Sequence, residues 1–323
     1  MLWKSMVVVL AVACTAGALQ GHAVAQAYPV RPVRMIVPFP PGGGSDFLAR
    51  IIAQDLAVAL GQQVVIDNRS GAQGSVGAAA VAKAPADGYT ILLSFVGFIA
   101  MNPWIYKDTG YDPLRDFSHI TLATSQPPLV VVNPRVPAAN LRELVALAKV
   151  KPDRLSFASS SSSGQLTGEL FKLLTGTRMV HVPYKGGGPA MIDVVGGHVD
   201  LMYASPPSSM PMVKAGKLRA IAVAGPKRLA AIPDVPTAHE SGFPDFDVNG
   251  WYGVAAPANT PREIISRLNT EISRVLNAAT VRDKLLTEGL EARPNSPEEM
   301  TSYVRAEYER WGKVVKAARL NPE

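Results

Sequence analysis

The stretch from Val33 to Arg50, VRMIVPFPPGGGSDFLAR, constrains the fold of this chain most strongly. Its apolar, β-branched start stops at a Pro/Gly turn, and apolar residues then recur at helical spacing from Phe47 to Leu56. The pattern predicts a strand, a glycine loop and a helix. Gly42, Gly43 and Gly44 lack side chains, so the loop can present backbone N–H groups beside the positive end of the helix dipole. Such a corner suits an anion, although the same unit also occurs in α/β proteins that bind no ligand.

Motifs for other chemistry are missing from the sequence. No G-x-G-x-x-G, G-x-x-x-x-G-K-[ST] or G-x-S-x-G occurs, which argues against dinucleotide, nucleotide and nucleophile-elbow sites. His119, His181, His198 and His239 lack the H-x-x-x-H spacing or the cysteine partner of a zinc site, so we expect no metal and no cofactor. A Ser/His/Asp triad stays open as an alternative, because its members meet only in space.

Residues 1–25 have the pattern of an export signal. Lys4 precedes an apolar run from Met6 to Ala13, and Ala23-Val24-Ala25 fits a cleavage site before Gln26. The only cysteine, Cys14, lies in this segment, where Ala11-Val12-Ala13-Cys14 also resembles a poor lipobox and leaves lipidation open. A cysteine-free mature chain that is exported predicts a periplasmic protein.

The charge of the chain does not point to nucleic acid. Loss of Lys4 with the leader lowers the formal charge from +6 to +5, and the basic residues are scattered, without the face or stripe that nucleic acid needs. The remaining 298 residues are enough for two domains.

Strands and helices alternate along most of the chain, which predicts parallel sheets with right-handed crossovers. The pattern runs from Val33 to Ser94, begins afresh after Pro127 and Pro128, and continues to Ala224. The last helices, from Pro261 onward, need a sheet to cover, and we expect them to return to the first domain. The chain would then cross between two lobes twice, near Pro127 and near Trp251, and form a hinge.

Ligands of such sheets gather where strands end. A second glycine corner, Tyr184-Lys185-Gly186-Gly187-Gly188-Pro189-Ala190, follows a predicted strand, as the first does. The serine run 159–164 lies between a strand and a helix, so its hydroxyl groups are expected at the same mouth rather than in a linker. We expect Asp46 to cap the first helix and hold its loop, while Lys185 is as well explained by solvation as by binding a carboxylate. The candidate ligand-binding residues are Phe39, Gly43, Gly44, Ser45, Asp46, Ser94, Ser160, Ser162, Gly164, Gln165, Lys185, Gly186, Gly187, Gly188, Pro189, Ala190, Tyr203 and Ser205.

Several segments in fixed order resemble one family. The Val33–Arg50 stretch, VVIDNRSGAQGSVGAAAVAKAPADGYTILL, VPYKGGGPAMIDVVGGHVDLM, MVKAGKLRAIAV and WYGVAAPANTP are similar to the Bug family, the extracytoplasmic solute receptors of tripartite tricarboxylate transporters. The likeness runs from about Tyr28 to Glu323. It implies a type II periplasmic-binding-protein fold, in which two α/β lobes close on a small carboxylate held largely by backbone amides and ordered water from the two glycine corners. The absence of arginine from both corners agrees with that mode of binding.

Two departures from the family pattern concern the ligand. Gln165-Leu166 stands where relatives often have His-Leu, and Ala204-Ser205 stands where many have Asp-Asn. Loss of that acid removes a partner for a ligand ammonium group. We therefore expect a carboxylate with an uncharged or aromatic tail rather than an amino acid.

These observations predict a monomeric periplasmic binding protein that captures a small organic carboxylate without chemistry and delivers it to the membrane subunits of a tripartite tricarboxylate transporter. The expected lobes are residues 26–126 with 249–323, and residues 127–248. A receptor that signals to a membrane sensor is one alternative, and a periplasmic hydrolase is another.

Overall fold

A computed structural model describes residues 28–320 and 322. The predicted export signal and Cys14 lie outside the described residues. From Arg31 onward the chain forms one compact unit that contains two sheets. No helix in the described part is long and apolar enough to cross a membrane.

The first sheet has six strands in the order β11-β4-β10-β3-β1-β2. Strands β1 (Val33–Val37), β2 (Val64–Asn68) and β3 (Thr90–Phe95) are parallel to one another. Strands β4 (Phe117–Gln126), β10 (Gly250–Pro257) and β11 (Glu291–Ala292) complete the sheet, and β10 runs antiparallel to both β3 and β4. Because β1, β2 and β3 are parallel, their carboxyl ends lie on one edge of the sheet.

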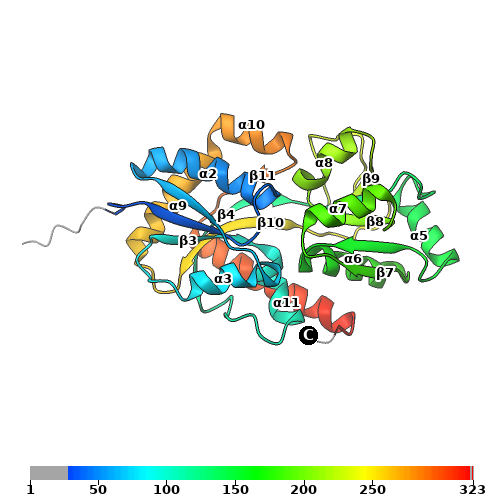
Figure 1. Ribbon diagram of the computed structural model, residues 1–323, viewed down its shortest axis with the longest axis horizontal. Coiled ribbons are helices and arrows are strands. Elements are labelled where there is room, and N and C mark those ends of the chain that lie inside the picture. The colour runs from blue at the N-terminus through cyan, green and yellow to red at the C-terminus, as the bar shows by residue number, and fades with distance from the viewer. Residues whose placement is uncertain (1–27, 321, 323) are drawn as a thin grey trace, which may run out of the picture. The chain divides into compact units, whose positions relative to one another are not determined.

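Helices cover both faces of this sheet (Figure 1). Helices α2 (Gly44–Leu60) and α9 (Arg262–Asn277) pack together on one face, whereas α3 (Ser75–Ala82) and α11 (Pro297–Ala317) lie on the other. Shorter helical segments complete the arrangement: η1 (Ala72–Gly74), η2 (Gly97–Met101), α4 (Asn102–Ile105) and α10 (Ala279–Thr287). We call this sheet with its helices the first lobe.

The second sheet has five strands in the order β7-β6-β8-β5-β9. They are β5 (Leu129–Val132), β6 (Ser156–Ser159), β7 (Val180–Pro183), β8 (Leu201–Ala204) and β9 (Arg219–Val223). Strands β6, β7 and β8 are parallel, so they too end on one edge. With helices α5 (Leu141–Val150), α6 (Ser162–Thr175), α7 (Gly187–Gly196) and α8 (Pro206–Lys214), this sheet forms what we call the second lobe.

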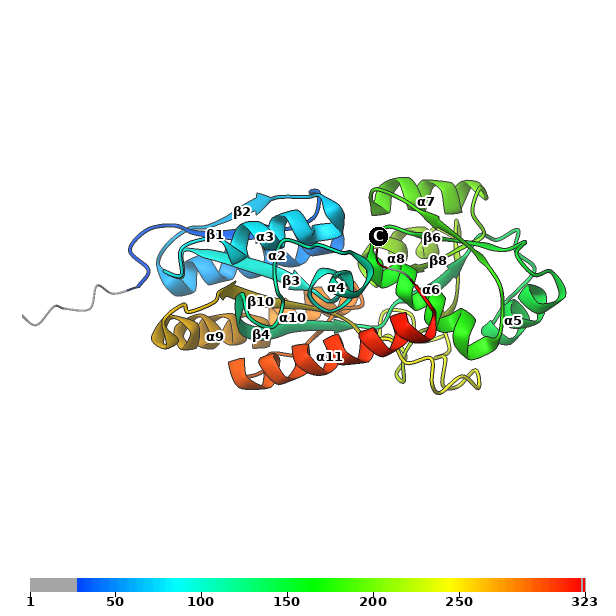
Figure 2. The ribbon, with the colours of Figure 1, turned by 90° about the horizontal axis from the view of Figure 1, so that it is seen from below.

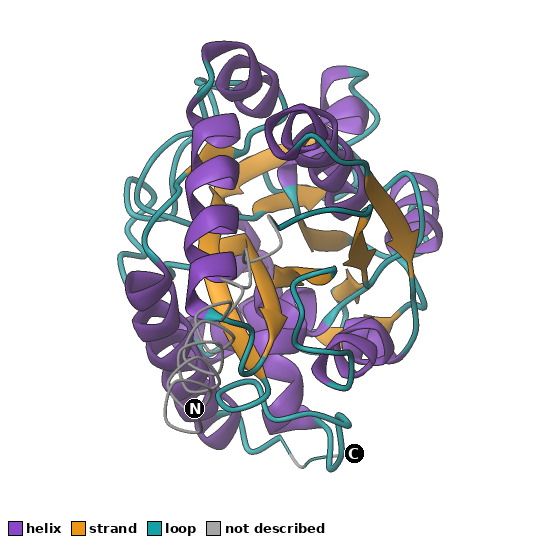
Figure 3. Cartoon of the chain, turned by 90° about the vertical axis from the view of Figure 1, so that its left-hand side faces the viewer, coloured by secondary structure: helices purple, strands orange, loops and turns teal. Residues whose placement is uncertain are grey.

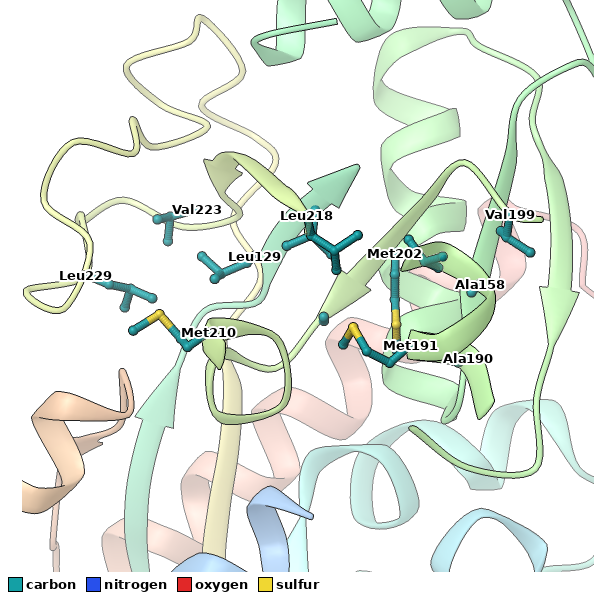
Figure 4. Packing of buried hydrophobic residues seen from close by; sticks show 13 residues of the cluster. Leu129, Ala158, Ala190, Met191, Val199, Met202, Met210, Leu218, Val223 and Leu229 are labelled. Carbon is teal, nitrogen blue, oxygen red and sulfur yellow. The ribbon is translucent and has the colours of Figure 1, made fainter. Parts of the chain in front are cut away.

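The second lobe has buried apolar side chains on both sides of its sheet. Figure 4 shows Leu129, Met191, Met202 and Met210 packed between strands and the helices α7 and α8. Aromatic rings pack on the α6 side, where Phe171 contacts Phe246 at a centroid distance of 5.2 Å. These two layers hold the carboxyl ends of β6, β7 and β8 in place.

The predicted parallel pairing is found in only part of each sheet, because both sheets are mixed. Strand β5 runs antiparallel to β8 and β9, and β10 runs antiparallel to its neighbours. The chain passes between the sheets twice, after Gln126 and before Gly250. Strand β5 follows the first passage and β10 follows the second, so each enters its sheet from the other lobe. Strand composition alone carries no information about that direction.

Besides the two chain passages, one helix contacts both lobes. Helix α11 packs on β4 in the first lobe, and its later turns lie beside α6 of the second lobe, as Figure 2 shows. Its first turn is fixed by a capping box, in which Ser296 and Glu299 satisfy each other's backbone N–H groups. Figure 3 shows the same sheets and helices from one end.

Candidate ligand-binding site

The first glycine corner joins β1 to α2. Helix α2 begins at Gly44 after the N-cap residue Gly43, which has no side chain to satisfy the first N–H groups. Gly42 adopts a left-handed conformation with φ of +84°, and Gly42 and Gly43 are exposed. Backbone N–H groups at the positive end of a helix dipole are thereby left available for an anion.

Asp46 holds this corner in shape. Its carboxylate accepts hydrogen bonds from Gly42 N at 3.1 Å, Arg50 Nε at 2.8 Å and Asn68 Nδ2 at 3.1 Å, and only 4% of the residue is exposed. Asn68 Nδ2 also donates to Phe39 O at 3.0 Å, which ties the start of the loop to the end of β2. The loop-holding prediction for Asp46 is confirmed, whereas the helix-cap prediction is wrong, since α2 has no side-chain cap.

The ionisation of Asp46 follows from these contacts. Burial favours the neutral carboxyl, but the hydrogen bonds from Arg50, Gly42 and Asn68, with the charge of Arg50, outweigh it and lower the pKa of Asp46. The carboxylate is therefore charged at neutral pH and fully engaged with the loop and with Arg50.

The second glycine corner joins β7 to α7. Helix α7 begins at Gly187 after the N-cap residue Gly186, again without a side-chain cap, and Pro189 lies in its first turn. Lys185, Gly187, Gly188 and Pro189 are exposed, whereas Ala190 is buried. The Tyr184 hydroxyl donates to Asp193 Oδ2 at 2.6 Å and fixes the entrance to this corner.

Three hydroxyl groups of the serine run between β6 and α6 have different surroundings. Ser161 is the N-cap of α6 and accepts from Gly164 N at 3.5 Å. Ser160 lies beside the second corner, since a Cβ built on Gly187 would be 3.8 Å from Ser160 Oγ. Ser162 is fully buried, and its Oγ donates to Gln73 Oε1 of the first lobe at 2.9 Å. The run is thus an ordered helix start and not a flexible linker.

Contacts between the lobes place their strand ends face to face. Besides the Ser162–Gln73 bond, a Cβ on Gly44 would lie 3.5 Å from Pro207 at the start of α8. Ser205, the N-cap residue of α8, directs its hydroxyl to Ser208 Oγ at 3.0 Å. The starts of α2, α6, α7 and α8 therefore lie near the boundary between the two lobes, as Figure 1 also shows for α2, α7 and α8.

An aromatic group stands beside the first corner. Phe39 meets Phe95 edge-to-face at 5.7 Å, and Phe95 lies 5.1 Å from the ring of Tyr252. The Tyr252 hydroxyl accepts from Ser45 Oγ at 3.2 Å, so the only hydroxyl of the glycine corner is bound to the protein itself. We call Phe39, Phe95 and Tyr252 the aromatic wall.

Two predicted site residues point elsewhere. Ser94 pairs with Gly253, and a Cβ on Gly253 would meet both Ser94 Oγ at 2.9 Å and Met300 of α11 at 2.7 Å. Because neighbouring residues in a strand face opposite sides, the Ser94 side chain lies on the α11 face and Phe95 on the face of the first corner. Tyr203 packs against Phe157 and Phe171 in the core of the second lobe. Burial, and to a lesser extent the negative charge of Glu169, raises the pKa of its hydroxyl. The structure thus places both side chains in packed interiors, Ser94 in the first lobe and Tyr203 in the second.

Other residues at the lobe boundary were missed. Gln73 and Asn102 come from the segments after β2 and β3, and Asn68 is the last residue of β2, but their amide side chains carried no motif. Tyr252 comes from β10, whose place next to β3 could not be read from the chain order. Among the described residues, no group of three or more His, Cys, Asp or Glu side chains could hold a metal ion.

The comparisons with known proteins agree with this geometry. The family model described as "Tripartite tricarboxylate transporter family receptor" matches residues 48–320. The chain belongs to this receptor family. The predicted Bug-family resemblance is confirmed by Protein BugT of Bordetella pertussis (strain Tohama I), which is 37% identical to the receptor over 295 residues, 90% of each chain.

Two solved structures share the fold of the receptor closely. Rpa4515 of R. palustris, solved with adipate, is 39% identical with a TM-score of 0.88 and covers 92% of this chain and 100% of its own. MatC of Rhodopseudomonas palustris, solved with bound malate, is 34% identical with a TM-score of 0.83 and covers 89% of this chain and 100% of its own. The predicted two-lobed α/β receptor fold is confirmed.

Proposed function

We propose that this receptor binds a small organic carboxylate between its two lobes, with the carboxylate group held by backbone N–H groups of the two glycine corners. One observation carries the proposal: α2 and α7 begin at glycine N-caps on strand ends that adjoin the lobe boundary. Helix starts of this kind attract anions. The adipate and malate in the related structures support a carboxylate as that anion.

The proposed ligand has an uncharged or aromatic tail. The only acid in the two corners, Asp46, is already bonded to Arg50, Gly42 and Asn68, so it offers little to a ligand ammonium group. Ala204-Ser205 adds no acid at the end of β8. The aromatic wall supplies apolar surface next to the first corner. The remaining candidate positions, such as Ser160, Gly164, Gln165 and Lys185, are proposed to shape the second lobe's side of the site.

The biological setting is also part of the proposal. Residues 1–25 would direct the chain to the periplasm, where the receptor would act as a monomer and pass its ligand to the membrane subunits of a tripartite tricarboxylate transporter. The lobes would comprise residues 26–126 with 249–323, and residues 127–248. Closure would be an equilibrium that the ligand shifts by contacting both lobes. Signalling to a membrane sensor would use the same binding step.

A thermal-shift screen of mono- and dicarboxylates tests the proposal. A ligand at 100 times its Kd adds about 2.7 kcal/mol of stability, enough for a clear rise in Tm. Hexanoate and benzoate, whose tails are uncharged, are the first probes, with adipate and malate from the related structures, adipamide as the uncharged match to adipate, and aspartate and glutamate as amino-bearing carboxylates. We expect a rise with a carboxylate and none with adipamide. Equal shifts with adipamide, or tight binding of aspartate, would contradict the proposed mode.

One observation favours testing for hydrolysis as well. Ser159 Oγ lies 2.7 Å from His181 Nε2, the distance of a nucleophile and its base. Ser159 is only 2% exposed, however, which leaves an ester little access to its hydroxyl. Turnover of p-nitrophenyl acetate that disappears in Ser159→Ala would favour an enzyme over a receptor.

A further inference from the structure

A buried hydrogen-bond network links the two lobes. Ser162, at the start of α6 in the second lobe, donates to Gln73 Oε1 at 2.9 Å and also contacts Asn102 Oδ1. Both acceptors belong to the first lobe. Asn102 Nδ2 in turn donates to Ser75 Oγ at 2.8 Å. Ser162 and Asn102 are fully buried, so this contact excludes water.

The first-lobe side of the network is built for close approach. Gln73 has a left-handed backbone with φ of +52°, unusual for a residue with a side chain, and this conformation holds its amide at the boundary. Asn102 Nδ2 also lies 3.4 Å from Gln73 O and steadies the same turn. Gly97 lies next to the start of α6, since a Cβ there would be 3.8 Å from Ser163 N, an ordinary contact, while the Phe95 ring at 2.8 Å leaves no room for one.

The Ser162 hydroxyl is committed to protein partners. It carries one hydrogen, which can be donated to only one of the two amide oxygens at a time, and both oxygens lie within its reach. This use differs from that of Ser161, which caps α6, and Ser160, which lies by the second glycine corner. Ser162 was predicted to bind ligand, but its contacts span the lobes instead.

We propose that Ser162, Gln73 and Asn102 form a latch that stabilises the closed arrangement of the lobes whichever carboxylate is bound. The proposal rests on the proposed function for its ligand. Separation of the lobes breaks the Ser162–Gln73 bond, so the latch adds free energy to the closed state alone. A contact of this kind changes the affinity for every ligand by one common factor, because affinity scales with the fraction of closed protein. It therefore sets how tightly the receptor binds and leaves selectivity to the ligand contacts.

Distances between two spin labels, measured by double electron–electron resonance, test the latch without any ligand. The labels are placed on the full chain in a Cys14→Ser background at Val65→Cys in the first lobe and Ile192→Cys in the second, which are 47% and 70% exposed. We expect a closed and an open population, and a closed-to-open ratio that falls roughly two- to tenfold in Ser162→Ala, the effect of one hydrogen bond. Gln73→Ala should give a similar fall, and the double variant little more.

Ser302→Ala is the matched control, because it also removes a helix hydroxyl, here one bonded to Glu298 O on an exposed face. It should leave the distances unchanged. Titrations of each carboxylate that binds the wild type should show Kd raised by one common factor in Ser162→Ala. An unchanged distance distribution in Ser162→Ala, or a Kd change that differs between carboxylates, would overturn the latch. If no carboxylate binds the wild type, the proposed function fails while the distances still decide the latch.

Discussion

At the scale of single residues, the shape of the first glycine corner depends on one carboxylate. Asp46 gathers donors from the loop, from α2 and from the end of β2. Its position after three glycines could be read from the sequence, and so could its loop-holding role. Its partners could not, because Asn68 is separated from it by 22 residues and meets it only through the parallel pairing of β1 with β2.

Replacement of Asp46 tests this arrangement. Asp46→Ala leaves the Gly42 N–H without its acceptor and the Asn68 amide with Phe39 O alone, so we expect a loss of about 1–3 kcal/mol in unfolding free energy. We also expect at least a tenfold weaker affinity for the carboxylate, since the corner loses its shape. Urea unfolding and calorimetric titration measure the two effects. Asp55→Ala, on the same helix, is the control, and equal effects of both variants would contradict the role given to Asp46.

A buried histidine gives a pH dependence. His119 is 5% exposed, and burial lowers its pKa from 6.5 to about 4, although a contact with Pro113 O opposes the shift. Between these two pH values His119 binds a proton in the unfolded chain but stays neutral in the folded chain. Stability should therefore fall as the pH falls through that window, by up to about 1.4 kcal/mol per pH unit.

The check is urea unfolding of the wild type and His119→Gln from pH 7 to about pH 4. The variant keeps a polar group near Pro113 O but has no proton to gain. Its unfolding free energy should lose less on acidification than that of the wild type. Parallel pH profiles of the two proteins would show that His119 does not titrate in this way.

At the scale of elements, the alternation of strands and helices predicted most of the secondary structure, because each amphipathic or apolar segment packs on a sheet. The segment 97–105 was missed, since the residues from Gly97 to Asn102 are all buried and show no polar face that would reveal a helix. Helix α6 begins inside the serine run, where Ser161 acts as its cap. The sequence predicted that this run lies between a strand and a helix and is not a linker, but only the local hydrogen bonds show that the helix begins within it.

The second glycine corner offers a graded test of one element. A Cβ on Gly187 would meet Ser160 Oγ at an ordinary 3.8 Å, and the backbone there is not left-handed, so Gly187→Ala should fold and bind nearly as the wild type does. Gly187→Val adds two methyl groups toward the same space and should abolish carboxylate binding. Thermal unfolding without ligand should be similar for both variants. Normal binding by Gly187→Val would show that the corner is only a turn.

At the scale of the whole molecule, the two sheets could be assigned from the sequence, but the residues that touch where the two lobes meet could not. The sequence contains two glycine corners, and only the structure brings Gly44 beside Pro207 and Ser162 onto Gln73. Residues at such a boundary contact one another through complementary shape and amide hydrogen bonds, and these leave no periodic pattern in the sequence. Ligand binding by the receptor is therefore expected to depend on amide groups from both lobes acting on one carboxylate.

Nuclear magnetic resonance of glycine-labelled receptor tests that claim most directly. The amide signals are compared before and after saturation with the carboxylate that raises Tm most in the thermal-shift screen. We expect the N–H signals of Gly43 and Gly44 and those of Gly187 and Gly188 to shift together, in proportion to the bound fraction. Shifts confined to one corner, or to glycines far from both, would contradict it.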